Sequence, residues 1–395
     1  MGNIVLEKTL SRVRDIFRLN KTSGSTGVDL VIHIGAPKTG SSAIQRFCLN
    51  NRTQLLRAGF YYPRHFVDKN GVSGGHSLVG RLLRENRVRK ANLYFKFMLL
   101  CARLRGKTLL LSSESFYRNS RKFGPLLKGL DVRVVGWFRH PVEAFVSNYN
   151  QSVKRHFKTA GISETLEEHY MKTGAANLNG RRLRHWADVV GDQHCTFLPY
   201  IKELKSGEFK HSDPIEKVWL RVLGIEAGQV NNFEFDDKQV NRSYVEEALE
   251  LKRMLNRVLS PEEAGLASKV DWALQDYSDN AEANDHSLGV YLEPEQVKKL
   301  NARFSRANAV LVRRFPTLKP ILKQGDAYVR QAEVSTDRAL DLSKPLAHLE
   351  SLYPEDYRNL QTRVAEQARR QTAPPSGELS RLAGLLGVYS QREFE

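Results

Sequence analysis

Hydrophobic residues occur along the chain in short runs separated by longer amphipathic stretches. Four of the runs carry aliphatic, often β-branched, side chains at consecutive positions, a pattern typical of strands buried on both faces. They are VDLVIHI at 28–34, KTLLLS at 107–112, VRVVGWF at 132–138 and CTFLP at 195–199. Because helical patterns lie between them, the sequence predicts an α/β fold with a doubly wound parallel sheet flanked by helices.

The stretches between the strands show helical spacing with recognisable ends. Residues 41–58 place apolar side chains on one side, and Gly59 is expected to end a single helix there. Pro141 suits the first turn of another helix. Ser243 and Glu246 have the spacing of a capping box, which predicts a helix that starts at Ser243.

The character of the sequence changes twice along the chain. Residues 1–27 are basic and amphipathic and end in a Gly/Ser-rich connector, which predicts a flexible N-terminal segment. Residues 28–318 contain all four predicted strands and should form the main domain. Residues 319–395 are charge-rich with helical spacing, so we expect a helical C-terminal extension outside the sheet.

Composition and charge narrow the class of protein. The 395 residues are 41% hydrophobic and 27% charged, which excludes wholesale disorder, and the net charge of +17 favours anionic partners. No apolar run approaches the ~20 residues of a membrane-spanning helix, and the start of the chain lacks the apolar core of a secretory signal. Three scattered cysteines do not suit a disulfide framework or a zinc site. We therefore expect a cytoplasmic protein, whose first twenty residues also suit a peripheral contact with the inner membrane face.

The first predicted strand runs directly into GAPKTGSS at 35–42 and then into a helix. A turn with two glycines before a helix start directs backbone N–H groups and the positive end of the helix dipole to one place, which suits a phosphate. Gly35 and Gly40 have the separation of the Walker pattern, but Ser41 stands where that pattern has lysine. The lysine of this loop is Lys38. The alternative is a turn that merely connects strand and helix.

A second set of anion-binding residues follows the strand at 132–138. Arg139 stands at the end of that strand, and Ser147 lies about two turns into the next helix. Both can donate hydrogen bonds to one phosphate, although a capped helix with a surface salt bridge explains them as well. Parallel strands end at the same edge of a sheet, where ligands bind. Two anion sites at one edge suit a ligand with two separated phosphates.

The two motifs together resemble the sulfotransferases that use 3′-phosphoadenosine 5′-phosphosulfate (PAPS), and the bacterial and carbohydrate-directed branches are most similar. The resemblance spans residues 28–318 and is carried by VIHIGAPKTGSSAIQRFCLNN, LLLSSE, VRVVGWFRHPVEAFVSNYNQ, NRS and FSRANAVLVRRFP. It implies a P-loop-type sheet and metal-independent transfer of a sulfuryl group to a hydroxyl, with 28–318 as the sulfotransferase domain. Ser41-Ser42 stand where the family commonly has Thr-Thr. The Arg-Lys-Gly signature of the small-molecule branch is missing from the sequence, so the resemblance favours a carbohydrate or glycolipid acceptor over a phenol or steroid.

The resemblance also assigns the donor-binding residues by position. The loop would hold the 5′-phosphosulfate, with Lys38 at the leaving phosphate and the sulfuryl group. Arg139 and Ser147 would hold the 3′-phosphate, which distinguishes PAPS from ATP-like nucleotides. The full set assigned to the donor is Pro37, Lys38, Thr39, Gly40, Ser41, Ser42, Arg139 and Ser147.

In-line transfer also needs a base that takes the proton of the acceptor hydroxyl. Glu114 directly follows the buried stretch KTLLLSS at 107–113 and should emerge at the ligand edge, where similar carbohydrate-directed enzymes often carry a glutamate or histidine. The alternative is a glutamate that only stabilises a helix N-terminus. His76 is the second candidate base, although a histidine after a Gly-rich turn is more often a surface or capping residue.

Two other classes of function fit part of the sequence. A P-loop kinase or NTPase would need a lysine after Gly40, where the chain has Ser41. A non-catalytic binder of nucleic acid or another polyanion would use the positive charge, but the sequence has no recognised nucleic-acid module and no interleaved aromatic and basic stripe. We therefore expect PAPS and a hydroxyl acceptor as partners, and no nucleic acid.

Overall fold

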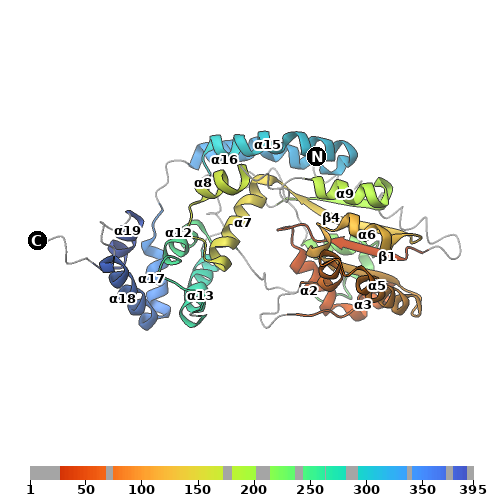
Figure 1. Cartoon of the computed structure of the whole chain (residues 1–395), viewed down its shortest axis with the longest axis horizontal. Helices are drawn as coiled ribbons and strands as arrows, with labels where there is room; N and C mark the ends of the chain where they lie inside the picture. The colour runs from red at the N-terminus through yellow and green to blue at the C-terminus, as the bar shows by residue number, and fades with distance from the viewer. Residues whose placement is uncertain are drawn as a thin grey trace, which may run out of the picture. The chain divides into compact units, whose positions relative to one another are not determined.

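The structure is a computed structural model that describes residues 27–67, 74–171, 180–201, 214–235, 243–262, 264–281, 292–335, 340–370 and 377–388. Contacts divide the chain into two compact units, each assembled from separate stretches. The first unit is Met1–Ala144, Ala176–Gln239 and Leu300–Gly325, and the second is Phe145–Ala175, Val240–Lys299 and Asp326–Glu395. The labels in Figure 1 follow the elements in chain order.

The first unit is built on a five-stranded parallel sheet with the strand order β2-β3-β1-β4-β5. The strands are β1 (Leu30–Ile34), β2 (Phe60–Tyr61), β3 (Thr108–Ser113), β4 (Val132–Arg139) and β5 (Cys195–Tyr200). The α/β class and the four predicted strands are confirmed. The edge strand β2 was not predicted, because two residues are too few to show a strand pattern.

Both faces of the sheet are buried, as expected for strands with apolar side chains at consecutive positions. Leu30, Ile32 and Ile34 point to one face, and Val31 with Leu110 points to the other. The first face packs against α4 (Ser77–Arg84), α5 (Val88–Arg103), α6 (Ser120–Leu127), α9 (Arg181–Val190) and the last turns of α15 (Pro294–Arg314). The second face packs against α2 (Ser41–Asn50), α3 (Arg52–Arg57) and α10 (Ile215–Val222), beside α11 (Ala227–Val230).

The single helix expected over residues 41–58 is wrong, because the chain forms α2 and α3 with a break at Asn51. The buried Asn51 amide donates to the carbonyl oxygens of Phe47, at 3.0 Å, and Glu234, at 2.8 Å. Its side-chain oxygen accepts from the Glu234 amide at 2.7 Å. These bonds anchor a distant segment at the break, a role that the apolar spacing of the sequence does not reveal.

Among its described residues, the second unit consists of helices and the loops that connect them, and three short helices belong to the first unit. The second unit contains most of α7 (Pro141–His156), α8 (Ile162–Thr165), the π-helix η2 (Leu166–Met171), α12 (Glu246–Leu255), α13 (Ala264–Asn280), the start of α15, most of α16 (Lys319–Ser335), α17 (Ser343–Leu352), α18 (Pro354–Arg370) and α19 (Gly377–Leu385). The short 3-10 helices of the first unit are η1 (Glu114–Phe116), η3 (Asp192–His194) and η4 (Pro316–Leu318).

The contacts do not divide the chain at the predicted boundary between residues 318 and 319. Helices α12 and α13 share one apolar core with α17, α18 and α19, in which Leu249, Val270 and Leu346 are fully or almost fully buried. The segment 319–395 is helical in its described part, as expected, but it packs with helices from the middle of the chain. An amphipathic pattern shows which side of a helix is apolar, and it does not show which distant helix covers that side.

The predicted capping box at Ser243 is wrong. Helix α12 begins at Glu246, with Val245 at its N-cap and no side-chain cap. The backbone N–H of Tyr244 donates to Asn150 at 3.3 Å, and that of Val245 donates to the Ser278 hydroxyl at 3.2 Å. These bonds to other helices hold the two residues before α12 outside the helix.

The expectations for the first residues fall outside the described part of the chain. The predicted flexible segment 1–27 and its membrane contact lie there, apart from Gly27. Among the helices that the structure describes, none combines the length and the apolar character needed to cross a membrane.

Candidate functional site

The candidate site lies at the carboxyl ends of β1 and β4, which are neighbours in the middle of the sheet. The chain leaves β1 toward β2, on one side, and leaves β4 toward β5, on the other. Such a reversal opens a crevice beside the strand ends, where α/β sheets bind ligands. The loop at 35–42 and Arg139 both come from this place, as the sequence predicts.

The loop between β1 and α2 is tightly built. A Cβ at Gly35 would lie 2.8 Å from the Ser41 Cβ, and one at Gly40, which has φ +74°, would lie 2.8 Å from the Ile215 Cδ1. Lys38 has φ +62°, in the left-handed region that non-glycine residues seldom adopt. Helix α2 begins at Ser41 and has no side-chain cap in the described structure. The first N–H groups of this ten-residue helix therefore suit an anion.

The predicted donor-binding residues of the loop differ in exposure. Thr39 is buried, and its hydroxyl donates to the Ala36 carbonyl at 2.7 Å, so Thr39 closes the loop on itself. Pro37 and Lys38 are half-buried, whereas Ser42 is exposed. An incoming phosphate can therefore reach Lys38 and Ser42 more readily than the Thr39 hydroxyl.

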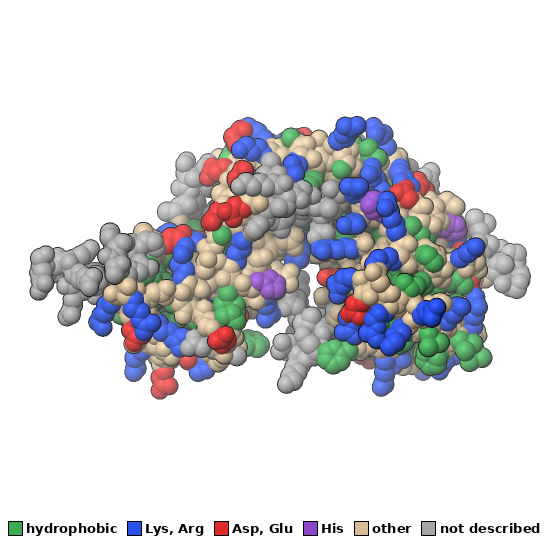
Figure 2. Space-filling model, in the orientation of Figure 1, with side chains coloured by type: hydrophobic (Ala, Val, Ile, Leu, Met, Phe, Trp, Pro, Cys, Tyr) green, Lys and Arg blue, Asp and Glu red, His purple; other side chains and the backbone are tan. Residues whose placement is uncertain are grey.

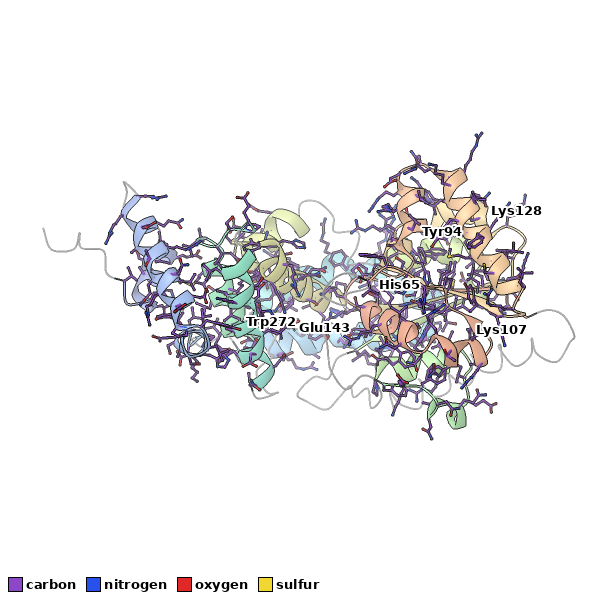
Figure 3. The ribbon with its side chains drawn as sticks, turned by 90° about the horizontal axis from the view of Figure 1, so that it is seen from below. His65, Tyr94, Lys107, Lys128, Glu143 and Trp272 are labelled. Carbon is purple, nitrogen blue, oxygen red and sulfur yellow. The ribbon has the colours of Figure 1, made fainter. Side chains whose placement is uncertain are left out.

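Arg139 attaches the loop to the end of β4. Its Nη1 donates to the Lys38 carbonyl at 2.9 Å, and its Nε donates to Glu143 Oε2 at 2.8 Å. The guanidinium carbon lies 5.3 Å from the centre of the Tyr200 ring. Both members of the ion pair are buried, and Glu143 is labelled in Figure 3. A phosphate bound by Arg139 would share the guanidinium with these partners or displace one of them.

The Lys38 ammonium lies in an environment that disfavours an uncompensated positive charge. Burial lowers the pKa of Lys38 from its usual value, and the charge of Arg139 lowers it further, while Glu114 acts in the opposite direction. An anion placed beside Lys38 and Arg139 would therefore gain more from them than from two exposed cations in water.

Glu114 occupies the carboxyl end of β3, as predicted, and its side chain is exposed. Its Oε1 accepts a hydrogen bond from the Ser41 hydroxyl at 2.5 Å. Glu114 is the first residue of the three-residue helix η1. A helix this short has too small a dipole to support the alternative that Glu114 only stabilises a helix N-terminus. The structure thus brings together the loop, the start of α2 and the candidate base.

The environment of His76 argues against a role as the base. It is buried at the N-cap of α4, where its Nε2 donates to the Pro63 carbonyl at 3.0 Å and its Nδ1 accepts from the Ser112 amide at 3.1 Å. A carbonyl can only accept, so these bonds fix a neutral ring, and burial lowers the pKa of His76 to about 3. Its role in the fold is to join the start of α4 to β3.

Ser147 lies on α7 in the second unit and is nearly buried, at 9% exposure. Its pairing with Arg139 over one phosphate therefore stays a prediction. The buried partner of Arg139 that the sequence reasoning missed is Glu143. The sequence indicates this partner through the four-residue separation of Glu143 from Arg139 at the start of α7. The apolar pattern of that helix draws attention to other positions.

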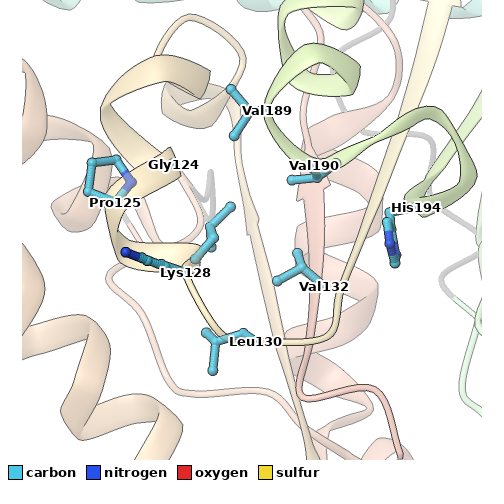
Figure 4. Close-up of a pocket in the computed structure, with 9 residues that line it drawn as sticks. Gly124, Pro125, Lys128, Leu130, Val132, Val189, Val190 and His194 are labelled. Carbon is cyan, nitrogen blue, oxygen red and sulfur yellow. The ribbon is translucent and has the colours of Figure 1, made fainter.

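A separate pocket of about 340 Å³ lies at the opposite end of β4 (Figure 4). Its lining includes Pro125 and Lys128 from the end of α6, Val132 from the start of β4, and His194. It shares no residue with the loop or with Arg139, so we assign it no part in the site. Among the residues that the structure describes, no group of three or more His, Cys, Asp or Glu side chains could hold a metal ion.

The close packing at Gly35 gives a first testable prediction. Replacing Gly35 by alanine should lower the free energy of unfolding by about 1–3 kcal/mol, because the new Cβ would overlap the Ser41 Cβ and crowd the Glu114 backbone. Urea denaturation measures this loss. Gly161→Ala is the control, since a Cβ there meets nothing within 4 Å, and it should change stability by less than ~0.5 kcal/mol. Equal losses in the two variants would show that Gly35 is not needed for close packing.

Comparison with known proteins gives no relative for this chain: no protein-family model matches it, and neither the curated proteins nor the solved structures give a significant match. The interpretation of the site therefore depends on its geometry and on the motifs in its sequence.

Proposed function

We propose that the chain is a PAPS-dependent sulfotransferase of the P-loop type that transfers a sulfuryl group to a hydroxyl of a carbohydrate or glycolipid. One observation carries the proposal. The left-handed lysine of the strand–loop–helix turn, an arginine from the neighbouring strand end and an exposed glutamate meet at one edge of a parallel sheet. This set supplies a charge for the leaving group and a base for the acceptor.

The loop is the proposed site of the 5′-phosphosulfate. The N–H groups at the start of α2 and the Lys38 ammonium would stabilise the negative charge that develops on the leaving phosphate oxygen. The lowered pKa of Lys38 supports this role. It results first from burial and then from the charge of Arg139, and a bound anion would compensate for both. Arg139 is the proposed site of the 3′-phosphate.

Glu114 is the proposed general base. Its carboxylate would take the proton from the acceptor hydroxyl while the acceptor oxygen forms a bond to sulfur. The bond between sulfur and the phosphate oxygen breaks at the same time, and adenosine 3′,5′-bisphosphate leaves. The hydrogen bond from Ser41 to Glu114 would hold the carboxylate beside the reacting sulfur, because Ser41 also begins the phosphate-binding helix.

A kinase or NTPase is the second candidate, and Ser41 in the Walker lysine position argues against it. An acceptor screen with donor labelled in its sulfuryl group separates the two. We expect label in a hydroxyl-bearing glycan or glycolipid, with one adenosine 3′,5′-bisphosphate formed for each group transferred. Magnesium-dependent ATP turnover without any transfer of label would favour the kinase or NTPase. Salt-sensitive binding of polyanions, with neither reaction, would favour a non-catalytic binder.

A further inference from the structure

Helix α5 carries a second apolar stripe that faces away from the core. Its inner side buries Phe95, Met98 and Leu99 against the sheet. On the outer side, four large apolar side chains are exposed: Leu93 at 73%, Phe97 at 61%, Leu100 at 53% and, just past the helix end, Leu104 at 77%. Their separations of four, three and four residues place them on one face. A helix on the surface of a soluble domain normally presents polar side chains there.

The charge around this stripe is of one sign. Residues 86–107 contain no Asp or Glu, and their basic side chains are Arg87, Arg89, Lys90, Lys96, Arg103, Arg105 and Lys107. Arg89 precedes Leu93 by one turn, and Lys96 precedes Leu100 by one turn, so each flanks the stripe. Both are exposed. In Figure 2, hydrophobic and basic side chains gather over the part of the molecule where Figure 1 labels α5.

Between described residues, acidic side chains from outside this stretch form ion pairs at the two ends of this surface. Asp29 pairs with Arg103 at 3.0 Å, and Glu85 pairs with Arg87 at 3.6 Å. Arg105 is held by the Cys101 carbonyl and lies over the Tyr61 ring. Lys96, in the middle, belongs to no ion pair between described residues. The centre of the stripe therefore combines apolar side chains with basic charge.

We infer that this face of α5 docks on a membrane surface that carries anionic phospholipids. Leu93, Phe97, Leu100 and Leu104 would enter the boundary between headgroups and acyl chains, while Arg89 and Lys96 contact lipid phosphates; we name these six residues the α5 docking face. A surface with apolar side chains in the middle and cations beside them fits this combination. A soluble protein partner would instead have to supply a matching acidic rim around an apolar centre. The inference does not depend on the proposed sulfotransferase activity.

Vesicle flotation with the full chain tests the inference. The protein should float with phosphatidylcholine vesicles that contain phosphatidylserine, and flotation with pure phosphatidylcholine should be at least about tenfold weaker. Raising the salt from ~0.1 M to ~0.5 M should weaken binding, because it screens the basic side chains. Equal binding to both kinds of vesicle, or binding to neither, would overturn the inference.

Two variants separate this face from the rest of the chain. Phe97→Ser with Leu100→Ser should lower binding to anionic vesicles at least about tenfold, since it removes the centre of the α5 docking face while keeping the buried side of the helix. Lys96→Gln should reduce the salt dependence. Trp272→Ser is the control, because it removes a large side chain, 69% exposed, from α13 and should leave binding unchanged. Undiminished vesicle binding by the double variant would overturn the inference. So would a wild-type protein that binds no vesicles and is a dimer, if the double variant converts that dimer to a monomer.

Discussion

Replacing Lys38 by alanine is expected to lower kcat for sulfuryl transfer by about 10²–10³-fold while the protein stays folded. The ammonium is the proposed partner of the leaving oxygen, so its loss removes an interaction that grows as the bond to sulfur breaks. The fold should survive, because burial already disfavours the charge of Lys38. Steady-state rates with labelled donor measure the loss of kcat, and urea denaturation measures whether the variant keeps its stability.

Lys128→Ala is the matched control for this variant. It removes the same charge from an exposed position beside the separate pocket at the far end of β4, and it should leave kcat unchanged. If Lys38→Ala transferred the sulfuryl group at the wild-type rate, the assignment of Lys38 would be wrong.

The lowered pKa of Lys38 also gives the direction of a pH effect. Donor affinity should be full below the pKa of Lys38 and decline as the pH rises through it, because the ammonium is then lost. Since the pKa lies below its usual value of 10.5, the decline should begin earlier than for an ordinary lysine. Lys38→Arg should remove this alkaline decline, because a guanidinium does not titrate there. A decline that persists in this variant would assign it to another group.

Replacing Glu114 by glutamine should lower kcat by about 10²–10⁴-fold and change donor affinity little. The amide oxygen of glutamine can still accept the Ser41 hydrogen bond, so the substitution removes the base and keeps the geometry. Single-turnover rates and calorimetry with adenosine 3′,5′-bisphosphate measure the two effects separately.

Glu85→Gln is the control for charge alone. Glu85 is exposed at the end of α4 and takes no part in the site, so its loss should not affect kcat. An unchanged kcat for Glu114→Gln would contradict the role of Glu114. Since both nitrogens of His76 are occupied in the structure, such a result would direct the search for a base to another residue or to the acceptor itself.

The sequence was sufficient for four of the five strands of the sheet and for the position of the loop. The consecutive apolar residues of β1, β3, β4 and β5 reflect burial on both faces, and burial is a property that a local pattern records. The glycines of the loop were also readable, because a Cβ at Gly35 or Gly40 would meet a neighbour at 2.8 Å. A position without room for a Cβ requires glycine, so local packing can be predicted from the local sequence.

Interactions between distant segments could not be predicted from the sequence. Asn51 divides the expected first helix because it binds Glu234, and His76 is unavailable as a base because Pro63 and Ser112 take its ring nitrogens. The partners that determine these roles come from other elements, and a pattern along one segment does not contain them. The shared core of α12 and α13 with the C-terminal helices was missed for the same reason.

Calorimetric titration with adenosine 3′,5′-bisphosphate and with adenosine 5′-phosphate tests the central claim most directly, because the ligands differ only in the 3′-phosphate. We predict that the bisphosphate binds the wild type about ten- to a hundredfold more tightly, as expected for added hydrogen bonds to a charged group. Arg139→Lys should reduce this preference, because it replaces the fork of donors by a single ammonium. Equal affinity for the two ligands, or no binding of either, would contradict the account.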